Sequence, residues 1–343
     1  MSHFLPSPYI EATGVGALPH TDPLAAWEAV LSIFPHIPFV PTLPNRGWNE
    51  QIVYNDSAHL PGRSVVEGRL YSDTEKDLSS EMETIYLDFL EGRVAPYGSD
   101  EEHASAFHTM MRHPPGKCDI LKCQVTGPVT FGMQVTDCKK RPLFYDAQFA
   151  DLLGKLLGLR AAWFETEMRK RVSAETLVMF SEPYLASLGS SVVPLDEESV
   201  EQALLDAVTL LKGAWGIHCC ANTDWGFLLS LQPSVLSFDA YMLAKEFLLY
   251  GEDIAAYLES GGVIAWGIVP SDPQVYSRES GTSLFDRYAS IRLRLLELVP
   301  EQRVDAQSLI TPTCGIRFGT EKEAEAILRG TAALAERIRS TYS

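Results

Sequence analysis

Three side chains of this sequence have the types and the spacing of a metal site. His218 and Cys220 end the apolar run AWGIHCC, and Cys314 ends a second apolar run, SLITPTC, much later in the chain. Side chains of a strand alternate between its two faces, so we expect His218 and Cys220 on one face and Cys219 on the other. One imidazole and two thiolates form a ligand set that suits zinc. With three protein ligands, a fourth position stays open for a substrate thiol, which the metal would make a nucleophile.

A structural explanation of the same residues stays open. Free cysteine is commonly a small core residue, and a histidine at a strand end is often only hydrogen-bonded. Cys118, Cys123 and Cys138 have no histidine at ligand spacing, and we interpret them as packing residues. The metal hypothesis therefore requires a fold that brings Cys314 beside His218.

The composition is that of a globular protein and argues against nucleic-acid and membrane partners. The 343 residues are 46% hydrophobic and 21% charged, with a net charge of −17. Binding of phosphate groups needs a concentration of Lys and Arg that this chain lacks. No apolar run approaches the roughly 18 residues of a membrane span, and the start has no signal-peptide pattern. The six cysteines therefore indicate reduced thiols in a cytoplasmic protein. The sequence leaves the oligomeric state open between a monomer and a homodimer.

Short apolar runs typical of strands alternate with helical patterns along the chain, which predicts parallel strands joined by crossover helices. Eight such units predict an α/β fold of the (β/α)8 TIM-barrel type. We expect one domain over residues 1–343, with a helical insertion after the second strand at roughly 45–117. The predicted strands are Ala12–Leu18, Pro38–Leu43, Ile120–Thr126, Leu177–Glu182, Trp215–Cys220, Val235–Asp239, Val263–Ile268 and Ser308–Cys314. The main predicted helices are Pro23–Phe34, Thr74–Glu91, Glu101–Arg112, Gln148–Arg171, Glu197–Leu211, Asp253–Glu259, Leu284–Leu298 and Glu321–Arg339.

The polar candidates all fall where predicted strands end. Active sites of such barrels lie at the carboxyl ends of the strands, so the fold would gather residues that are distant in sequence. His218, Cys220 and Cys314 lie at two of these ends, and Glu182 and Asp239 lie at two others. A carboxylate at Glu182 would bind an amino group, protonate a leaving group or ligate the metal.

Five further residues are candidates for the substrate site. Gly16 and Ala17 belong to the bend TGVGALP, which lacks the third glycine of a dinucleotide-binding loop. We expect a glycine-rich bend whose backbone N–H groups face a ligand. Gln124 and Thr126 end the third predicted strand, before the tight turn of QVTGPVTFG. Trp266 is a candidate to stack on a planar cofactor, with core packing as the alternative.

In order along the chain, TGVGALPHTDP, CQVTGPVTFG, a Glu-Pro strand end, IHCCANTD, VLSFDAY and TPTCGIR resemble one known superfamily, which unites uroporphyrinogen decarboxylase and cobalamin-independent methionine synthase. The resemblance runs from Thr13 to about Arg317. It implies a (β/α)8 barrel in which His218, Cys220 and Cys314 bind zinc.

The resemblance also implies transfer of a methyl group to a zinc-bound thiolate. Asp239 would be the fourth ligand or a hydrogen-bond partner of His218. Three positions depart from the methionine-synthase pattern. Ala17 stands where the family has serine, Ser181 stands for the aspartate of an Asp-Glu-Pro motif, and Val269 lies where a proton-donating histidine is expected.

The sequence thus predicts a zinc-dependent, methionine-synthase-like methyltransferase of methionine biosynthesis. Its acceptor would be a small thiol, homocysteine or a related compound, and its donor a folate or a methylated corrinoid carried by a partner protein. Glu182 would orient the substrate. Two alternatives stay open: a non-catalytic ligand-binding or sensing barrel, and a lyase resembling uroporphyrinogen decarboxylase.

Overall fold

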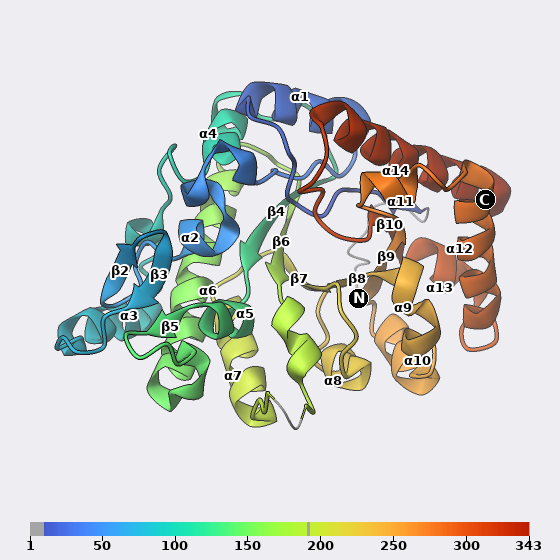
Figure 1. Cartoon of the computed structure of the whole chain (residues 1–343). Helices are drawn as coiled ribbons and strands as arrows, with labels where there is room; N and C mark the ends of the chain where they lie inside the picture. The colour runs from blue at the N-terminus through green and yellow to red at the C-terminus, as the bar shows by residue number, and fades with distance from the viewer. Residues whose placement is uncertain (1–9, 191–192, 343) are drawn as a thin grey trace.

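A curled sheet of seven parallel strands forms the centre of the molecule (Figure 1). The computed structural model describes residues 10–190 and 193–342. The strand order is β1-β10-β9-β8-β7-β6-β4, so neighbours in sequence are mostly neighbours in the sheet. The strands are β1 (Glu11–Ala12), β4 (Ile120–Thr126), β6 (Glu175–Ser181), β7 (Ala214–Cys219), β8 (Val235–Phe238), β9 (Val263–Val269) and β10 (Ser308–Pro312).

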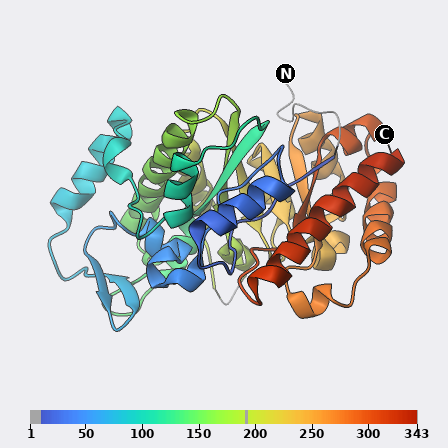
Figure 2. The same cartoon turned by 90° about the horizontal axis from the view of Figure 1, so that it is seen from above.

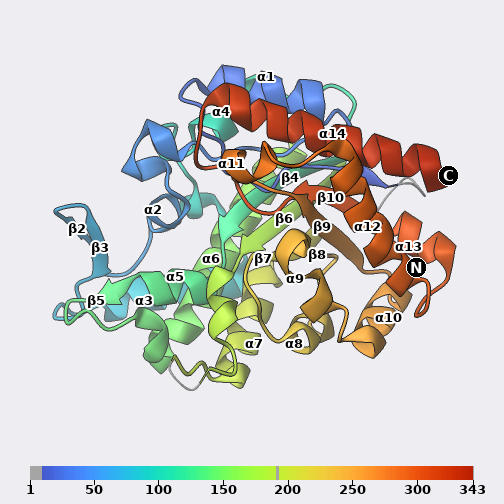
Figure 3. The ribbon, with the colours of Figure 1, turned by 45° about the vertical axis from the view of Figure 1, so that its right-hand side comes forward.

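Helices cover the outer face of this sheet (Figures 1 and 3). Helices α1 and α14, from near the two ends of the chain, lie side by side and cover the edge formed by β1 and β10. Of the helices in the described residues, none is long and apolar enough to cross a membrane. The covering helices are α1 (Pro23–Ile33), α6 (Ala147–Arg169), α7 (Glu197–Val208), α8 (Trp225–Ser230), α9 (Ala240–Phe247), α10 (Gly251–Glu259), α11 (Pro273–Tyr276), α12 (Gly281–Leu295), α13 (Glu301–Ala306) and α14 (Glu321–Tyr342).

Alternation along the strands divides the core into an inner and an outer layer. Residues at every second position fill the inside of the curled sheet, because strand side chains alternate between faces. The layer between the strands and the helices takes the intervening residues, among them Ile264, Trp266 and Ile268 of β9. The inner layer consists of Ile37, Ile120, Leu177, Met179, Val235, Val263, Ala265 and Leu309.

The sheet has seven regular strands among the described residues, one fewer than the sequence predicts. The predicted strand Pro38–Leu43 contributes only two isolated bridges, Phe39 with Lys122 of β4 and Thr42 with Ala17. Pro38 and Pro41 lack the N–H group that a ladder needs, so regular pairing cannot develop there. The gap between β4 and β1 is thus spanned by an extended segment, and a complete eight-stranded barrel is not seen in residues 10–190 and 193–342.

The predicted insertion contains a β-hairpin as well as helices (Figure 2). The hairpin turns at Glu67 and Gly68, both with positive φ, a backbone conformation typical of tight hairpin turns. Its second strand also pairs with the two-residue strand β5 (Thr136–Asp137), which follows α5 (Pro128–Gln134). The elements of the insertion are α2 (Ile52–Asp56), β2 (Arg63–Val66), β3 (Arg69–Ser72), α3 (Ser79–Glu91) and α4 (Ser105–Arg112).

A fully buried ion pair ties the insertion to the sheet. Arg160 of α6 donates from Nε to Asp56 Oδ1 at 2.8 Å, and each side chain is only 1% exposed. The other carboxylate oxygen of Asp56 accepts the backbone N–H of Thr126, at the end of β4, at 2.7 Å. Arg160 also donates to Asn55 and to the backbone carbonyl of Tyr97. The start of the insertion is therefore fixed relative to the carboxyl end of β4.

Candidate metal centre

The curl of the sheet brings the three predicted metal ligands together. His218 lies in β7, Cys220 directly follows that strand, and Cys314 follows β10. Although β8 and β9 separate the two strands in the sheet, one ligand atom from each of these residues lies within 4.8 Å of the others. Tetrahedral zinc with bonds of 2.0–2.3 Å places its ligands about 3.5–3.8 Å apart, so the group needs little adjustment to hold the ion.

Cys219 points away from this group. Its side chain is fully buried in the outer layer of the core, and its Sγ donates to the backbone carbonyl of Ala221 at 3.4 Å. The alternation of β7 thus selects His218 and Cys220 for the inner face.

The two thiols of the group lie close together and differ in acidity. The neighbouring Cys314 thiol, together with His218, lowers the pKa of Cys220 below its ordinary value. The neighbouring Cys220 and burial raise the pKa of Cys314 above its ordinary value. The favoured arrangement is a thiolate at Cys220 beside a thiol at Cys314. A cation would be stabilised by this thiolate, because thiolate is the form that binds metals.

His218 presents one free nitrogen to the group. Its Nδ1 lies 2.9 Å from the Oγ of Ser237, and its Nε2 is buried without a hydrogen-bond partner in the described part of the chain. A buried polar atom without a partner is costly unless a water, an ion or another ligand satisfies it. When Nδ1 carries the proton and donates to Ser237, Nε2 has the lone pair that a metal needs. The donor set and this vacant lone pair both fit zinc.

Asp239 does not join the ligand group. It is the N-cap of α9, and its Oδ1 accepts the backbone N–H of Met242 at 2.9 Å. Burial and the negative charge of Cys220 raise the pKa of Asp239 to about 6, against which the N–H bond from Met242 acts. The charge of Cys220 therefore acts on Asp239, but the helix cap holds the Asp239 carboxylate outside the group of three ligand residues.

The ligand group forms part of the wall of a cavity of about 370 Å³. Four of the five predicted substrate residues, namely Gly16, Ala17, Gln124 and Thr126, also line it. The remaining lining residues come from the first loop, the insertion, α5 and the strand ends: Val15, Thr42, Pro44, Glu50, Gln51, Ile52, Val53, Tyr54, Arg69, Leu70, Thr130, Gln134, Val135, Ser181, Pro183, Gly315 and Arg317. The cavity is therefore bounded by the sheet on one side and the insertion on the other.

Gln124 and Thr126 have different hydrogen-bonding states in this wall. Gln124 donates from Nε2 to Ser181 at 2.5 Å and accepts from Lys122 at 3.3 Å, so its amide is fixed in orientation. Thr126 has a buried hydroxyl without a partner among the described residues. That hydroxyl is therefore available to a bound molecule.

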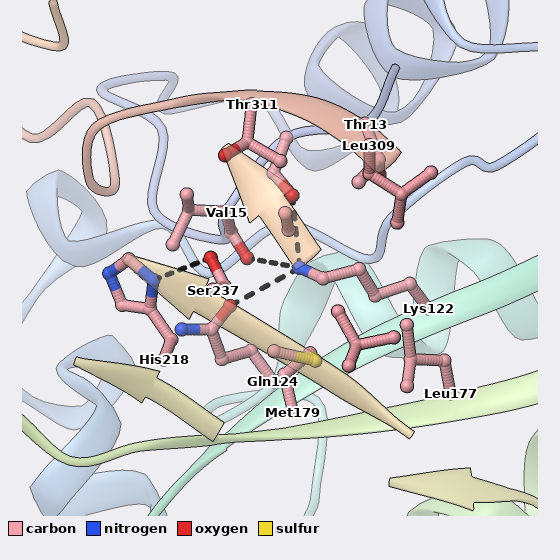
Figure 4. A pocket seen from close by; sticks show the side chains of 13 residues that line it. Thr13, Val15, Lys122, Gln124, Leu177, Met179, His218, Ser237, Leu309 and Thr311 are labelled. Carbon is pink, nitrogen blue, oxygen red and sulfur yellow. Dashed lines mark hydrogen bonds between the residues drawn. The ribbon is translucent and has the colours of Figure 1, made fainter. Parts of the chain in front are cut away.

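A small buried space of about 10 Å³ inside the curled sheet is lined by the imidazole of His218 and by Lys122, among other residues (Figure 4). Lys122 projects into it and donates from Nζ to the backbone carbonyls of Gly14 and Val15, at 2.9 and 2.5 Å. Burial lowers the pKa of Lys122 to about 7. Lys122 therefore satisfies two carbonyls of the first loop that no regular strand pairing serves, and holds the segment that leads to Gly16.

Glu182 does not line the cavity. Its carboxylate is fully buried at the start of α5 and accepts the backbone N–H groups of Val129 and Thr130 at 3.0 and 2.7 Å. Burial raises its pKa to about 7, and the two hydrogen bonds act against that shift. The close approach requires Gly127, because a Cβ at that position would lie 2.1 Å from Glu182 Oε1. Glu182 thus positions the α5 wall.

Trp266 lies outside the cavity, in the outer layer of the core. It packs against Phe238 and Phe247, and its Nε1 donates to the hydroxyl of Ser308 at 3.0 Å. The inner position of β9 next to it is taken by Ala265. The indole is therefore not available to stack on a ligand in the cavity.

The insertion and the loop after Cys314 supply cavity residues that sequence reasoning missed. Glu50, Tyr54 and Arg69 come from the insertion, and Arg317 follows Cys314 by three positions. Only Arg317 had a local signal, its proximity to a predicted ligand. The others reach the cavity through long-range packing that no short motif encodes.

Comparisons with known proteins find similar structures only. No protein-family model matches this chain, and no curated protein matches it. A B12-independent methionine synthase from Shewanella sp. W3-18-1 is 18% identical, with a TM-score of 0.47, over 64% of this chain and 62% of that one. A putative vitamin-B12 independent methionine synthase from Listeria monocytogenes is 14% identical, with a TM-score of 0.51, over 96% and 98%. A GH113 beta-mannanase from Alicyclobacillus acidocaldarius is 11% identical, with a TM-score of 0.43, over the whole of both chains.

These similarities concern the fold. The Listeria protein shares the overall α/β architecture over nearly the full length of both chains. The chain spans about 62% of the length of the Shewanella protein. Because fold similarity at such low identity does not determine function, the chemistry of this chain has to be argued from its own site.

Proposed function

We propose that this protein is a zinc-dependent methyltransferase that transfers a methyl group to a small thiol, in the manner of a methionine synthase. The observation that carries the proposal is the convergence of His218, Cys220 and Cys314 within 4.8 Å at the wall of a cavity, with a buried imidazole nitrogen left free. Zinc held there would lower the pKa of an incoming thiol, so that its sulfur is nucleophilic at neutral pH. We also propose that the segment 38–42 takes the place of the missing strand of a (β/α)8 barrel.

The chain's own residues have three tasks in this reaction. The walls of the cavity between sheet and insertion would limit the access of water, which would compete with sulfur for the methyl carbon. Gln124, held between Lys122 and Ser181, and the free hydroxyl of Thr126 orient the substrate. The acceptor sulfur then attacks the methyl carbon, and the bond to the donor breaks as the new carbon–sulfur bond forms. The donor is a methylated folate or a corrinoid, the latter carried by a partner protein.

The direct test is methyl transfer by the zinc-loaded protein. Methylcobalamin or 5-methyltetrahydrofolate is incubated with homocysteine or with 2-mercaptoethanesulfonate, and the thioether is measured by mass spectrometry. We expect thioether to form with at least one donor and one thiol, and to disappear in Cys220→Ser. Cys219→Ser is the matched control, because its sulfur lies in the core and not at the site.

The second candidate is a binding protein without turnover. It is favoured by one observation, that Glu182 and Asp239 both use their carboxylates to cap helices, α5 and α9 respectively. Zinc and thiol binding without any thioether product, across all donors, would support it over the methyltransferase. The lyase alternative has no comparable support from the cavity.

A further inference from the structure

Two arginines line the cavity that contains the ligand group. Arg69 comes from β3 of the insertion, and Arg317 from the loop after β10. They are the only Lys or Arg residues among those found to line this cavity. In a chain with 28 basic and 45 acidic residues, two cations that share one cavity require an explanation.

Arg317 has no hydrogen bond or ion pair with any residue of the described part of the chain. Its side chain is exposed. Three extended residues span at most about 11 Å, so its Cα lies within that distance of the Cα of Cys314. Arg317 also lines the same cavity as His218, Cys220 and Cys314, and its charge acts on the Cys314 thiol, so one molecule in the cavity can contact both.

Arg69 is held in place but not neutralised. Its Nη2 donates to the hydroxyl of Thr136 at 2.6 Å and to the backbone carbonyl of Asp137 at 3.1 Å. Its guanidinium lies over the ring of Tyr71, 5.2 Å from the centroid. No carboxylate of the described residues lies within ion-pair distance of it. The contacts fix the orientation of the guanidinium and leave its charge for a ligand.

Most other arginines of the described chain are neutralised. Carboxylates within 4.0 Å pair with Arg46, Arg93, Arg112, Arg160, Arg169, Arg287, Arg292, Arg294, Arg329 and Arg339. The acidic residue of the cavity wall, Glu50, is itself occupied, since its Oε1 accepts from Arg46 Nε at 3.1 Å and from the backbone of Ser105 at 3.3 Å. It therefore does not cancel the charge of the two cavity arginines.

We infer that Arg317 and Arg69 form an anion-binding subsite, which binds the carboxylate or sulfonate group of the acceptor. This inference rests on the proposed thiol acceptor. A planar guanidinium binds either group with two parallel hydrogen bonds, and a cavity wall strengthens such pairs relative to open water. The ligand group would take the sulfur and the arginines the anion, so that two anchors fix the thiol in the cavity.

Binding of a matched set of thiols to the zinc-loaded protein tests the subsite. The probes are 3-mercaptopropionate, 2-mercaptoethanesulfonate and the neutral 3-mercapto-1-propanol, each titrated calorimetrically. We expect the two anionic thiols to bind at least about tenfold more tightly than the neutral one. Arg317→Gln and Arg69→Gln should each remove most of that preference while zinc content and the affinity for the neutral thiol stay unchanged. Arg171→Gln, which removes one exposed charge between α6 and β6, at the opposite end of the strands, should retain it.

The preference between the two anionic thiols identifies the group that the subsite accepts. Equal binding of anionic and neutral thiols by the wild type would overturn the subsite and leave the thiol acceptor intact. A preference that survives in both arginine variants would also overturn it.

A second arm separates the subsite from the proposed function. The thioethers 3-(methylthio)propionate and 3-(methylthio)-1-propanol are titrated into the metal-free protein, in which neither zinc nor a thiol takes part. A preference for the acid that depends on Arg317 supports the subsite even when no thiol binds to the zinc-loaded protein, an outcome that would remove only the proposed function. Equal binding of the two thioethers contradicts the subsite.

Discussion

His218 and Ser237 lie directly opposite each other on adjacent strands, with the imidazole Nδ1 2.9 Å from the serine hydroxyl (Figure 4). Register alone produces this contact, because both residues occupy inner positions of the sheet. The contact occupies Nδ1 and leaves Nε2 free for a metal. Ser237 therefore orients a ligand without belonging to the ligand group.

Ser237→Ala should weaken zinc binding without abolishing it. Loss of a hydrogen-bond partner to a ligating histidine typically costs 10–100-fold in metal affinity, since the ring loses its fixed tautomer and orientation. Competition with a chromophoric chelator measures the change. Ser290→Ala, which removes an exposed hydroxyl from α12, is the control. Unchanged affinity in Ser237→Ala would show that the serine does not orient the ring.

The buried pair of Asp56 and Arg160 should make a large contribution to stability. Arg160→Met leaves Asp56 buried without its cation, an arrangement that costs about 3–5 kcal/mol. Urea unfolding measures the loss. Arg294→Met removes one partner of an exposed pair with Glu297 and should cost much less. Similar losses in the two variants would contradict the anchoring role of Arg160.

Gly127 should tolerate no side chain while Glu182 is present. Gly127→Ala places a Cβ 2.1 Å from the Glu182 carboxylate and should cost about 1–3 kcal/mol of unfolding free energy. The penalty should shrink in a Glu182→Ala background, because the clash partner is gone. Gly116→Ala, where no atom lies within 4 Å of the added Cβ, is the control. If Gly127→Ala costs as much unfolding free energy in the Glu182→Ala background, the cost does not come from contact with Glu182.

Lys122 should make stability depend on pH. Its pKa of about 7 in the folded protein is below its ordinary value near 10.5, so the unfolded chain binds more protons between these values. The Lys122 contribution therefore rises with pH across this window, by up to about 1.4 kcal/mol per pH unit. The difference in unfolding free energy between wild type and Lys122→Met should grow from pH 7 to pH 9.5. A difference that stays constant would mean that Lys122 remains charged in the fold.

The group of His218, Cys220 and Cys314 was predictable because short sequence patterns and general rules of parallel sheets determine it. Strand alternation selects His218 and Cys220 over Cys219, and the rule that parallel strands end at one edge brings Cys314 to them. The same alternation explains why Trp266 faces the helices, once the register of β9 is known. The sequence did not indicate which of the two alternating sets of β9 side chains faces the inside of the sheet.

The remaining parts of the site depend on long-range packing. Arg69 reaches the cavity only because a hairpin inside the insertion folds against β5, and the turn signal Val-Glu-Gly-Arg was too short to predict that placement. Glu182 was expected at the cavity from its place at a strand end. Its carboxylate instead accepts the free N–H groups at the start of α5. The sequence does not reveal whether this carboxylate binds the helix or faces the cavity. The second predicted strand is a different case, because the prolines at 38 and 41 are a signal in the sequence that its pairing is irregular.

Zinc content of the purified protein tests the central claim most directly. Apo-protein is reconstituted with one equivalent of zinc, desalted and analysed for metal, in the wild type and in His218→Ala, Cys220→Ser, Cys314→Ser and Cys219→Ser. We predict about one zinc per chain in the wild type and in Cys219→Ser, and almost none in the other three variants. A Cys314→Ser variant that remains fully loaded, or a Cys219→Ser variant that is empty, would contradict the site.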